Sequence, residues 1–200
     1  MRMSFKTIRR VTLGLSLGVL FSGMALADPV RIVAFGGSNT FGTNLPRGDS
    51  YPAQLEALLK AAGHDVVVKN EGTNGQTTAE ELQIMDSAVP PGTQIVIFQP
   101  GGNDKGKRAV KAGTAIDTAG NIETMVQRFL DRKILVLFSG VGPRRDALQR
   151  FDISMINEIN RLAPEHLQAD GEHLTAQGYA IVAQKMMPKV VQLIEKLPAR

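Results

Sequence analysis

The sequence contains no cysteine among its 200 residues. A catalytic thiol, a disulfide framework and a metal site built from thiolates are therefore excluded. The chain also lacks internal repeats, low-complexity stretches and any obvious interdomain linker. Its length corresponds to one domain, or to one domain plus an extension. Such a domain is large enough to form a hydrophobic core without covalent cross-links.

A hydrophobic run long enough to cross a bilayer, about 20 residues, is also missing. The apolar or small stretch from Val11 to Leu26 is shorter, follows a basic segment and ends in the small-residue site Ala25-Leu26-Ala27. This pattern predicts a secretory signal peptide over residues 1–27, cleaved after Ala27. We therefore expect a periplasmic or secreted protein with no membrane span after cleavage. The alternative is an uncleaved membrane anchor.

The remainder of the chain has no excess of either charge. Four of the 23 Lys and Arg residues, and none of the 19 Asp and Glu residues, lie in residues 1–27, so residues 28–200 carry 19 of each. The high pI thus belongs to the targeting segment. Charge gives no reason to expect nucleic acid as a partner.

Continuous apolar runs alternate with amphipathic stretches after residue 28. The predicted strands are Val30–Phe35, Val66–Val68, Gln94–Gln99 and Lys133–Phe138, and the predicted helices are Tyr51–Ala62, Thr77–Ala88, Ala115–Asp131, Arg145–Ala163 and Thr175–Leu197. This order predicts an α/β fold, a three-layer sandwich with a parallel sheet of four to five strands. Ligands of such sheets bind at the carboxyl ends of the strands.

Two polar segments far apart in the sequence carry the first chemical signal. Ser38 follows the first strand on a glycine-rich turn, and Asp170 and His173 stand three residues apart near the end. A serine hydroxyl becomes a strong nucleophile when a base takes its proton and a third group orients that base. If the fold brings these segments together, the pattern indicates a serine hydrolase.

Four segments resemble the sequence blocks of the SGNH (also called GDSL) hydrolase family, in the family's order. They are Gly36-Gly37-Ser38-Asn39-Thr40, Asn70-Glu71-Gly72-Thr73-Asn74-Gly75-Gln76-Thr77-Thr78, Gly101-Gly102-Asn103-Asp104 and Asp170-Gly171-Glu172-His173. One block alone is a weak signal, whereas four in order, each after the expected strand, are specific. The resemblance covers nearly all of residues 28–200, which we interpret as one hydrolase domain with a flavodoxin-like SGNH fold.

The resemblance implies roles for individual residues. Ser38 is the expected nucleophile, His173 the base and Asp170 the group that orients His173. The backbone N–H groups of Ser38 and Gly75 and the amide of Asn103 are the expected oxyanion hole. The implied reaction is hydrolysis of carboxylic esters or thioesters, without metal or cofactor, on a small acyl ester or an acylated glycan or lipid.

The chain departs from the family pattern at the serine turn and near the C-terminus. Gly37 replaces the usual Asp, and Asn39 replaces the usual Leu beside Ser38. The short connection from Ala163 to Asp170 predicts that the family's fifth strand is vestigial or absent there. Basic residues follow the Asn103 block and the fourth predicted strand. Together with Asn39 they are the expected rim of the substrate site, and their charge would favour an anionic substrate. These basic residues are Lys105, Lys107, Arg108, Lys111, Arg144 and Arg145.

Other interpretations of the same residues stay open. Ser38, Asn103 and the Asp170–His173 pair could each be a helix cap or a turn, and the basic rim could be a solvated loop. A classical α/β-hydrolase fits less well, because Thr40 replaces the last glycine of its nucleophile elbow. A dinucleotide-binding fold lacks the glycine spacing. One alternative with the same serine chemistry is an O-acetyl glycan deacetylase. An alternative without catalysis is a catalytically impaired protein that only binds its ligand.

Overall fold

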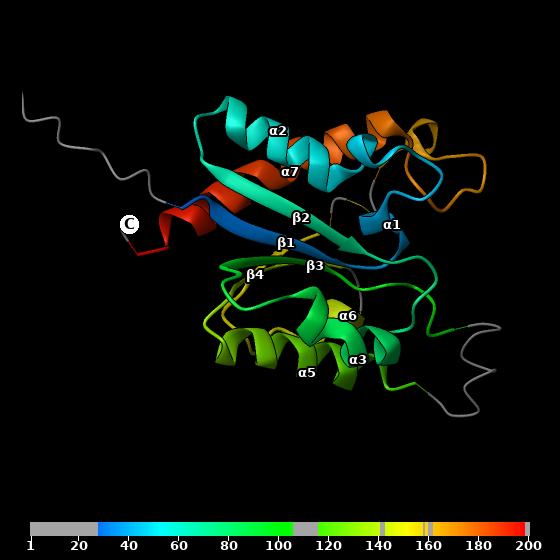
Figure 1. Cartoon of the computed structure of the whole chain (residues 1–200). Coiled ribbons are helices and arrows are strands. Elements are labelled where there is room, and N and C mark those ends of the chain that lie inside the picture. The colour runs from blue at the N-terminus through cyan, green and yellow to red at the C-terminus, as the bar shows by residue number, and fades with distance from the viewer. Residues whose placement is uncertain (1–27, 106–115, 141–142, 158, 160–161, 199–200) are drawn as a thin grey trace, which may run out of the picture.

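The protein, as a computed structural model, is described for residues 28–105, 116–140, 143–157, 159 and 162–198. Five parallel strands form one sheet in the order β2-β1-β3-β4-β5. The strands are β1 (Val30–Gly36), β2 (Val66–Gly72), β3 (Ile95–Gln99), β4 (Leu135–Ser139) and β5 (Ser154–Ile156). Helices cover both faces of the sheet, which confirms the predicted α/β sandwich (Figure 1). The predicted signal peptide lies outside the described residues.

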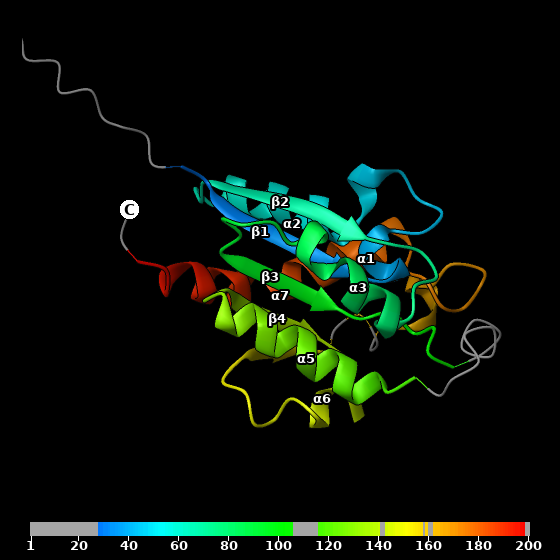
Figure 2. The ribbon, with the colours of Figure 1, turned by 60° about the horizontal axis from the view of Figure 1, so that its bottom comes forward.

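Two long helices lie on each face. α2 (Tyr51–Ala61) and α7 (Ala176–Glu195) cover one face, and α3 (Thr78–Ala88) and α5 (Thr118–Asp131) cover the other, as Figure 2 shows from the α5 side. The short helical elements are α1 (Ser38–Phe41), η1 (Arg47–Asp49), α6 (Pro143–Asp146) and η3 (Pro164–His166). Thr77 and Thr175 cap the N-termini of α3 and α7, because their hydroxyls accept backbone N–H groups of the first turn.

The central strands are apolar on both sides because both sides are covered. In β1, Ile32 and Ala34 join the core under α2 and α7, whereas Val33 and Phe35 join the core under α3 and α5. Burying one such large side chain contributes about 1.5–3 kcal/mol. Two cores on opposite faces therefore fix the central strands, and with them the loops at the strand ends.

The predicted helix Arg145–Ala163 is wrong. Helix α6 ends at Asp146, and Ser154–Ile156 pairs with Leu137–Ser139 of β4 as the short strand β5. The backbone N–H and C=O groups of this segment form hydrogen bonds with the edge of β4, and not the hydrogen bonds of a continued helix. The fifth strand is therefore present, although we expected it to be vestigial or absent, and it lies before Ala163.

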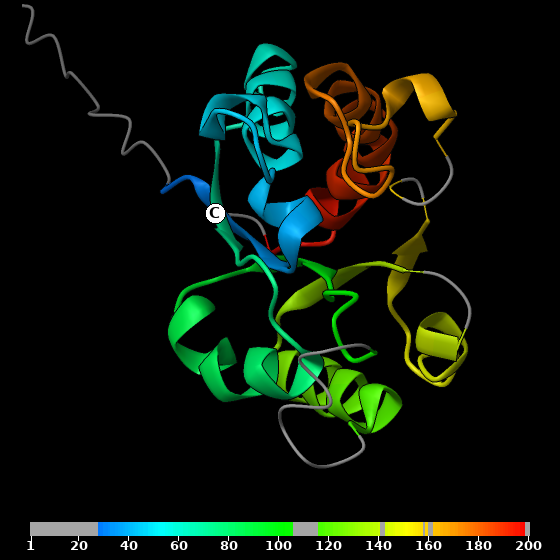
Figure 3. The same cartoon turned by 90° about the vertical axis from the view of Figure 1, so that its right-hand side faces the viewer.

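The carboxyl ends of β1, β2 and β3 meet at one edge. Gly36, near the serine turn, pairs with Gly72 of β2 and with Gln99 of β3. The strand order reverses between β1 and β3, which is the position where open α/β sheets bind ligands. Figure 3 looks onto this edge, with α1 near its centre. Three of the four motif segments therefore start from neighbouring strands.

Candidate active site

Ser38 is the first residue of α1 and stands directly beyond the end of β1. The turn before it depends on Gly36, whose φ is +145°, and whose missing Cβ would lie 1.8 Å from the Gln99 carbonyl oxygen. The N–H of Gly37 donates to that same carbonyl at 3.0 Å. The backbone thus turns sharply against β3 and presents a half-buried Ser38 at the sheet edge.

The turn is held from both neighbouring strands. The buried Thr40 hydroxyl donates to Gln99 Oε1 at 3.1 Å, and the Thr40 carbonyl accepts from Asn70 Nδ2 at 2.8 Å. Asn70 lies inside β2, which extends beyond the strand predicted at Val66–Val68. Side chains of β2 and β3 therefore clamp α1 and fix the direction in which Ser38 leaves the sheet.

Asp170 and His173 form a hydrogen-bonded pair in the loop before α7. Asp170 Oδ2 lies 2.8 Å from His173 Nδ1, and Asp170 Oδ1 accepts the backbone N–H groups of Glu172 and His173 at 2.9 and 3.0 Å. The His173 backbone hydrogen bond, then the His173 ring and the Glu172 N–H, lower the pKa of Asp170 to about 2. An ionised carboxylate only accepts hydrogen bonds, so Nδ1 carries a proton and donates it.

Two side chains, Gln168 before the Asp170–His173 pair and Tyr179 of α7 after it, hydrogen-bond to the chain that follows Ser38. Gln168 Nε2 donates to the carbonyls of Thr43 at 2.9 Å and Leu174 at 2.7 Å, and Gln168 Oε1 accepts from Asn44 at 3.2 Å. The Tyr179 hydroxyl of α7 donates to Asn39 Oδ1 at 2.9 Å. These bonds join the residues that follow Ser38 to residues on either side of the Asp170–His173 pair, although about 130 residues separate the two regions in the sequence.

Gly75 and Asn103 come from the loops that follow β2 and β3. Gly75 has a φ of +71° in the turn before α3. The Asn103 side-chain amide donates to the carbonyl of Gln76 at 3.1 Å, which places Asn103 beside this turn. The neighbouring Asp104 accepts the N–H and hydroxyl of Thr78, and so anchors the Asn103 segment on the N-terminus of α3.

The predicted substrate rim is only partly described. Lys105 is exposed, whereas Lys107, Arg108 and Lys111 lie outside the described residues. Arg144 of α6 is half-buried and reaches the Pro100 carbonyl at 3.5 Å, and Asn39 is held by Tyr179. Both side chains therefore make hydrogen bonds within the protein, Arg144 to the segment after β3 and Asn39 to α7.

Glu81 of α3 was not predicted from the sequence. Its side chain is fully buried, and Oε1 accepts the backbone N–H of Gly101 at 2.8 Å. Burial raises the pKa of Glu81 to about 8; the Gly101 hydrogen bond opposes this shift, and Asp104 adds to it. One sequence signal could have found it, because Glu81 shares the helical spacing of the buried Met85 and Ala88.

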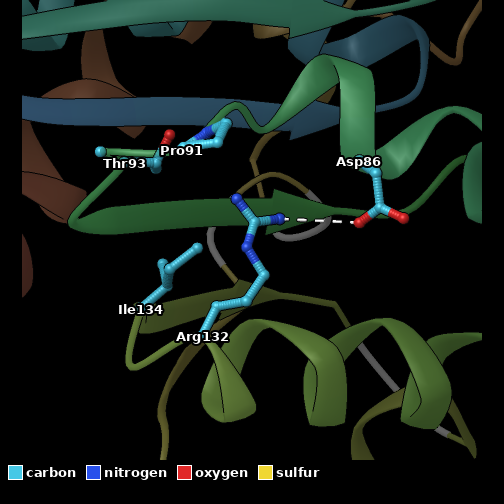
Figure 4. A pocket seen from close by; sticks show the side chains of 6 residues that line it. Asp86, Pro91, Thr93, Arg132 and Ile134 are labelled. Atoms are coloured by element: carbon cyan, nitrogen blue, oxygen red, sulfur yellow. Dashed lines mark ion pairs between the residues drawn. The ribbon is translucent and has the colours of Figure 1, made fainter.

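A separate hollow lies at the opposite edge of the sheet (Figure 4). It lies between the end of α3 and the start of β4, and Arg132 and Asp86 form an ion pair at 3.7 Å in it. Because Ser38 and His173 lie at the carboxyl edge, this hollow belongs to a different part of the molecule.

Two features are absent from the part of the chain that the structure describes. That part contains no group of three or more metal-ligating side chains and no helix that is long and apolar enough to span a bilayer.

Comparison with known proteins identifies the family of this chain. The GDSL-like Lipase/Acylhydrolase family matches residues 34–171. AlinE4, described as an SGNH-hydrolase family esterase, is 26% identical, with coverage of 88% of this chain and all of AlinE4 and a TM-score of 0.62. No curated protein matches this chain.

Two structures of lower sequence identity show the same fold. The psychrotrophic esterase EstA from Pseudoalteromonas sp. is 12% identical with a TM-score of 0.71, covering 84% of this chain and all of EstA. TesA is 19% identical with a TM-score of 0.68, covering 82% of this chain and 99% of TesA. The family match includes the segments of Ser38, Gly75, Asn103 and Asp170 and covers well over half of the chain. The chain therefore belongs to the GDSL-like Lipase/Acylhydrolase family.

Proposed function

We propose that the protein is a serine esterase that hydrolyses carboxylic esters or thioesters through an acyl-Ser38 intermediate. The observation that carries this proposal is the hydrogen-bonded Asp170–His173 pair. The nearby Gln168 links its loop to Thr43, five residues after Ser38. A surface cap or turn does not need such a link across the fold. The small acyl esters used by the family are the proposed substrates.

The chemistry divides among three side chains. Ser38 Oγ attacks the carbonyl carbon, and His173 Nε2 takes the hydroxyl proton because Nδ1 is occupied by Asp170. The tetrahedral intermediate collapses, the C–O or C–S bond breaks, and His173 returns the proton to the leaving alcohol or thiol. Water then attacks the acyl-enzyme in the same way, which releases the acid and regenerates Ser38. Asp170 stabilises the imidazolium in both steps.

The negative charge of the intermediate needs hydrogen-bond donors. We assign this role to the backbone N–H groups of Ser38 and Gly75 and to the Asn103 amide. The Gln76 carbonyl accepts one Nδ2 hydrogen of Asn103, and this bond orients the amide. Losing one donor of this kind typically costs about 2.7–4 kcal/mol of transition-state stabilisation.

A labelling experiment tests the proposal. An organophosphonate serine probe should label the purified protein, and p-nitrophenyl acetate should be hydrolysed. Ser38→Ala should abolish labelling and reduce kcat by about 10³-fold or more, because the nucleophile is gone. Ser87→Ala is the matched control, since Ser87 is an exposed serine of α3, and it should behave like wild type. A folded wild type that neither reacts with the probe nor turns over would instead indicate a binding protein.

A further inference from the structure

Glu81 lies directly behind the serine turn and the segment that carries Asn103. A Cβ added to Gly37 would lie 2.5 Å from Gly101 Cα and 3.8 Å from Glu81 Oε1. The Gly101 N–H donates to the same oxygen at 2.8 Å. The Glu81 carboxyl therefore stands where the serine turn and the Asn103 segment approach most closely. Residue 37 has no room for the Asp side chain that is usual there.

The contacts of this carboxyl favour its protonated form. Glu81 Oε2 is buried and has no hydrogen-bond partner among the described residues. An ionised oxygen without a partner is costly in such a place, whereas a protonated one is far less so. The charged groups that act on it are Asp104 after β3, Arg144 of α6 and the adjacent Glu80. Two of these three are acids, so together they do not compensate for burial of a negative charge.

We propose that Glu81 is a positioning residue for the esterase reaction: its neutral carboxyl holds Gly101, and through it Asn103, against the serine turn. This inference rests on the proposed function. Ionisation of Glu81 places a buried negative charge beside the site where the oxyanion develops, and so opposes the transition state. The same carboxyl thus sets an upper pH limit for activity.

The pH profile of kcat/KM distinguishes this role from plain packing. Wild type should lose activity above about pH 8, where Glu81 ionises, falling by about tenfold per pH unit. Glu81→Gln keeps a neutral group of the same shape, so it should match wild type at pH 7 within about threefold and lack the alkaline decrease. Glu195→Gln is the matched control: it changes an exposed glutamate at the end of α7, far from Glu81 in the sequence, and should keep the decrease.

Thermal unfolding gives a readout that does not depend on turnover. A carboxyl whose folded pKa is raised from 4.5 to about 8 makes the protein less stable as pH rises through that range. The melting temperature of wild type should therefore decrease relative to that of Glu81→Gln between pH 5 and 8. The role of Glu81 is overturned if Glu81→Gln keeps the alkaline decrease of kcat/KM. It is also overturned if the melting temperature of Glu81→Gln depends on pH as steeply as that of wild type. A wild type without turnover that still shows the stability slope overturns the esterase function instead.

Discussion

At the scale of single residues, the Asp170–His173 pair makes the sharpest prediction. Asp170→Asn removes the carboxylate that fixes the proton on Nδ1, so His173 loses the tautomer that leaves Nε2 as a base. We expect kcat to fall by about 10³–10⁴-fold with little change in KM. Steady-state kinetics on p-nitrophenyl acetate measure this. The control Asp152→Asn changes an exposed acid elsewhere; equal activity of the two variants would contradict the assigned role.

The same pair has a defined response to pH. Because its pKa is lowered to about 2, Asp170 stays ionised throughout the working range. Its contribution to stability is present above the unfolded value of 3.8 and is lost as pH falls toward 2. A decrease of activity in mildly acidic buffer therefore does not report protonation of Asp170.

Residues differ in how far the sequence reveals them. Ser38 and His173 belong to short motifs whose spacing is set by local turns, so the sequence alone can mark them. Glu81 and Gln168 act through contacts across the fold, with Gly101 and Thr43 respectively. No local sequence pattern encodes such a contact. The sequence marks Glu81 only as an acidic residue at the helical spacing of the apolar positions Met85 and Ala88.

At the scale of elements, Gln168 joins the loop of His173 to the loop after α1. Gln168→Ala removes hydrogen bonds to Thr43, Asn44 and Leu174, each contributing about 0.5–1.5 kcal/mol. We expect the unfolding free energy to fall by about 1.5–4.5 kcal/mol and kcat to fall about tenfold, because His173 is less well placed. Urea denaturation and kinetics measure the two effects. Gln149→Ala, at an exposed glutamine, is the control; an unchanged kcat in Gln168→Ala would refute the link.

A helix or strand could be predicted from the sequence where its apolar residues follow one regular spacing and are the residues that it buries. Segments without such a regular spacing could not be predicted. α5 buries one clear face, with Ile122, Met125, Val126 and Phe129, and it appears within three residues of its expected start. Between 145 and 163 the pattern was ambiguous. Ile153 and Met155 alternate toward the α3–α5 core, as strand residues do, but only pairing with β4 decides between strand and helix.

At the scale of the whole molecule, the sheet explains why distant motifs form one site. Parallel strands direct the loops after β1, β2 and β3 to one edge, and α7 packs against α2 so that its N-terminal loop reaches that edge. The alternation of strands and helices predicts this convergence. The links that complete it, such as Tyr179 to Asn39, depend on how α7 packs.

The last prediction concerns export of the whole chain. We propose that residues 1–27 direct the protein out of the cytoplasm and are removed after Ala27, because a basic segment, an apolar run and small residues at the cleavage site occur in that order. Expressed in full in a bacterial host, the protein should be recovered from the periplasm or medium, and intact mass should show the chain beginning at Asp28. Ala27→Phe places a large side chain at the cleavage site and should leave the segment attached, whereas Ala62→Phe, distant from that site, should be processed normally. A wild-type chain of full mass in the cytosol would refute export, and a full-mass chain in the membrane fraction would identify an uncleaved anchor.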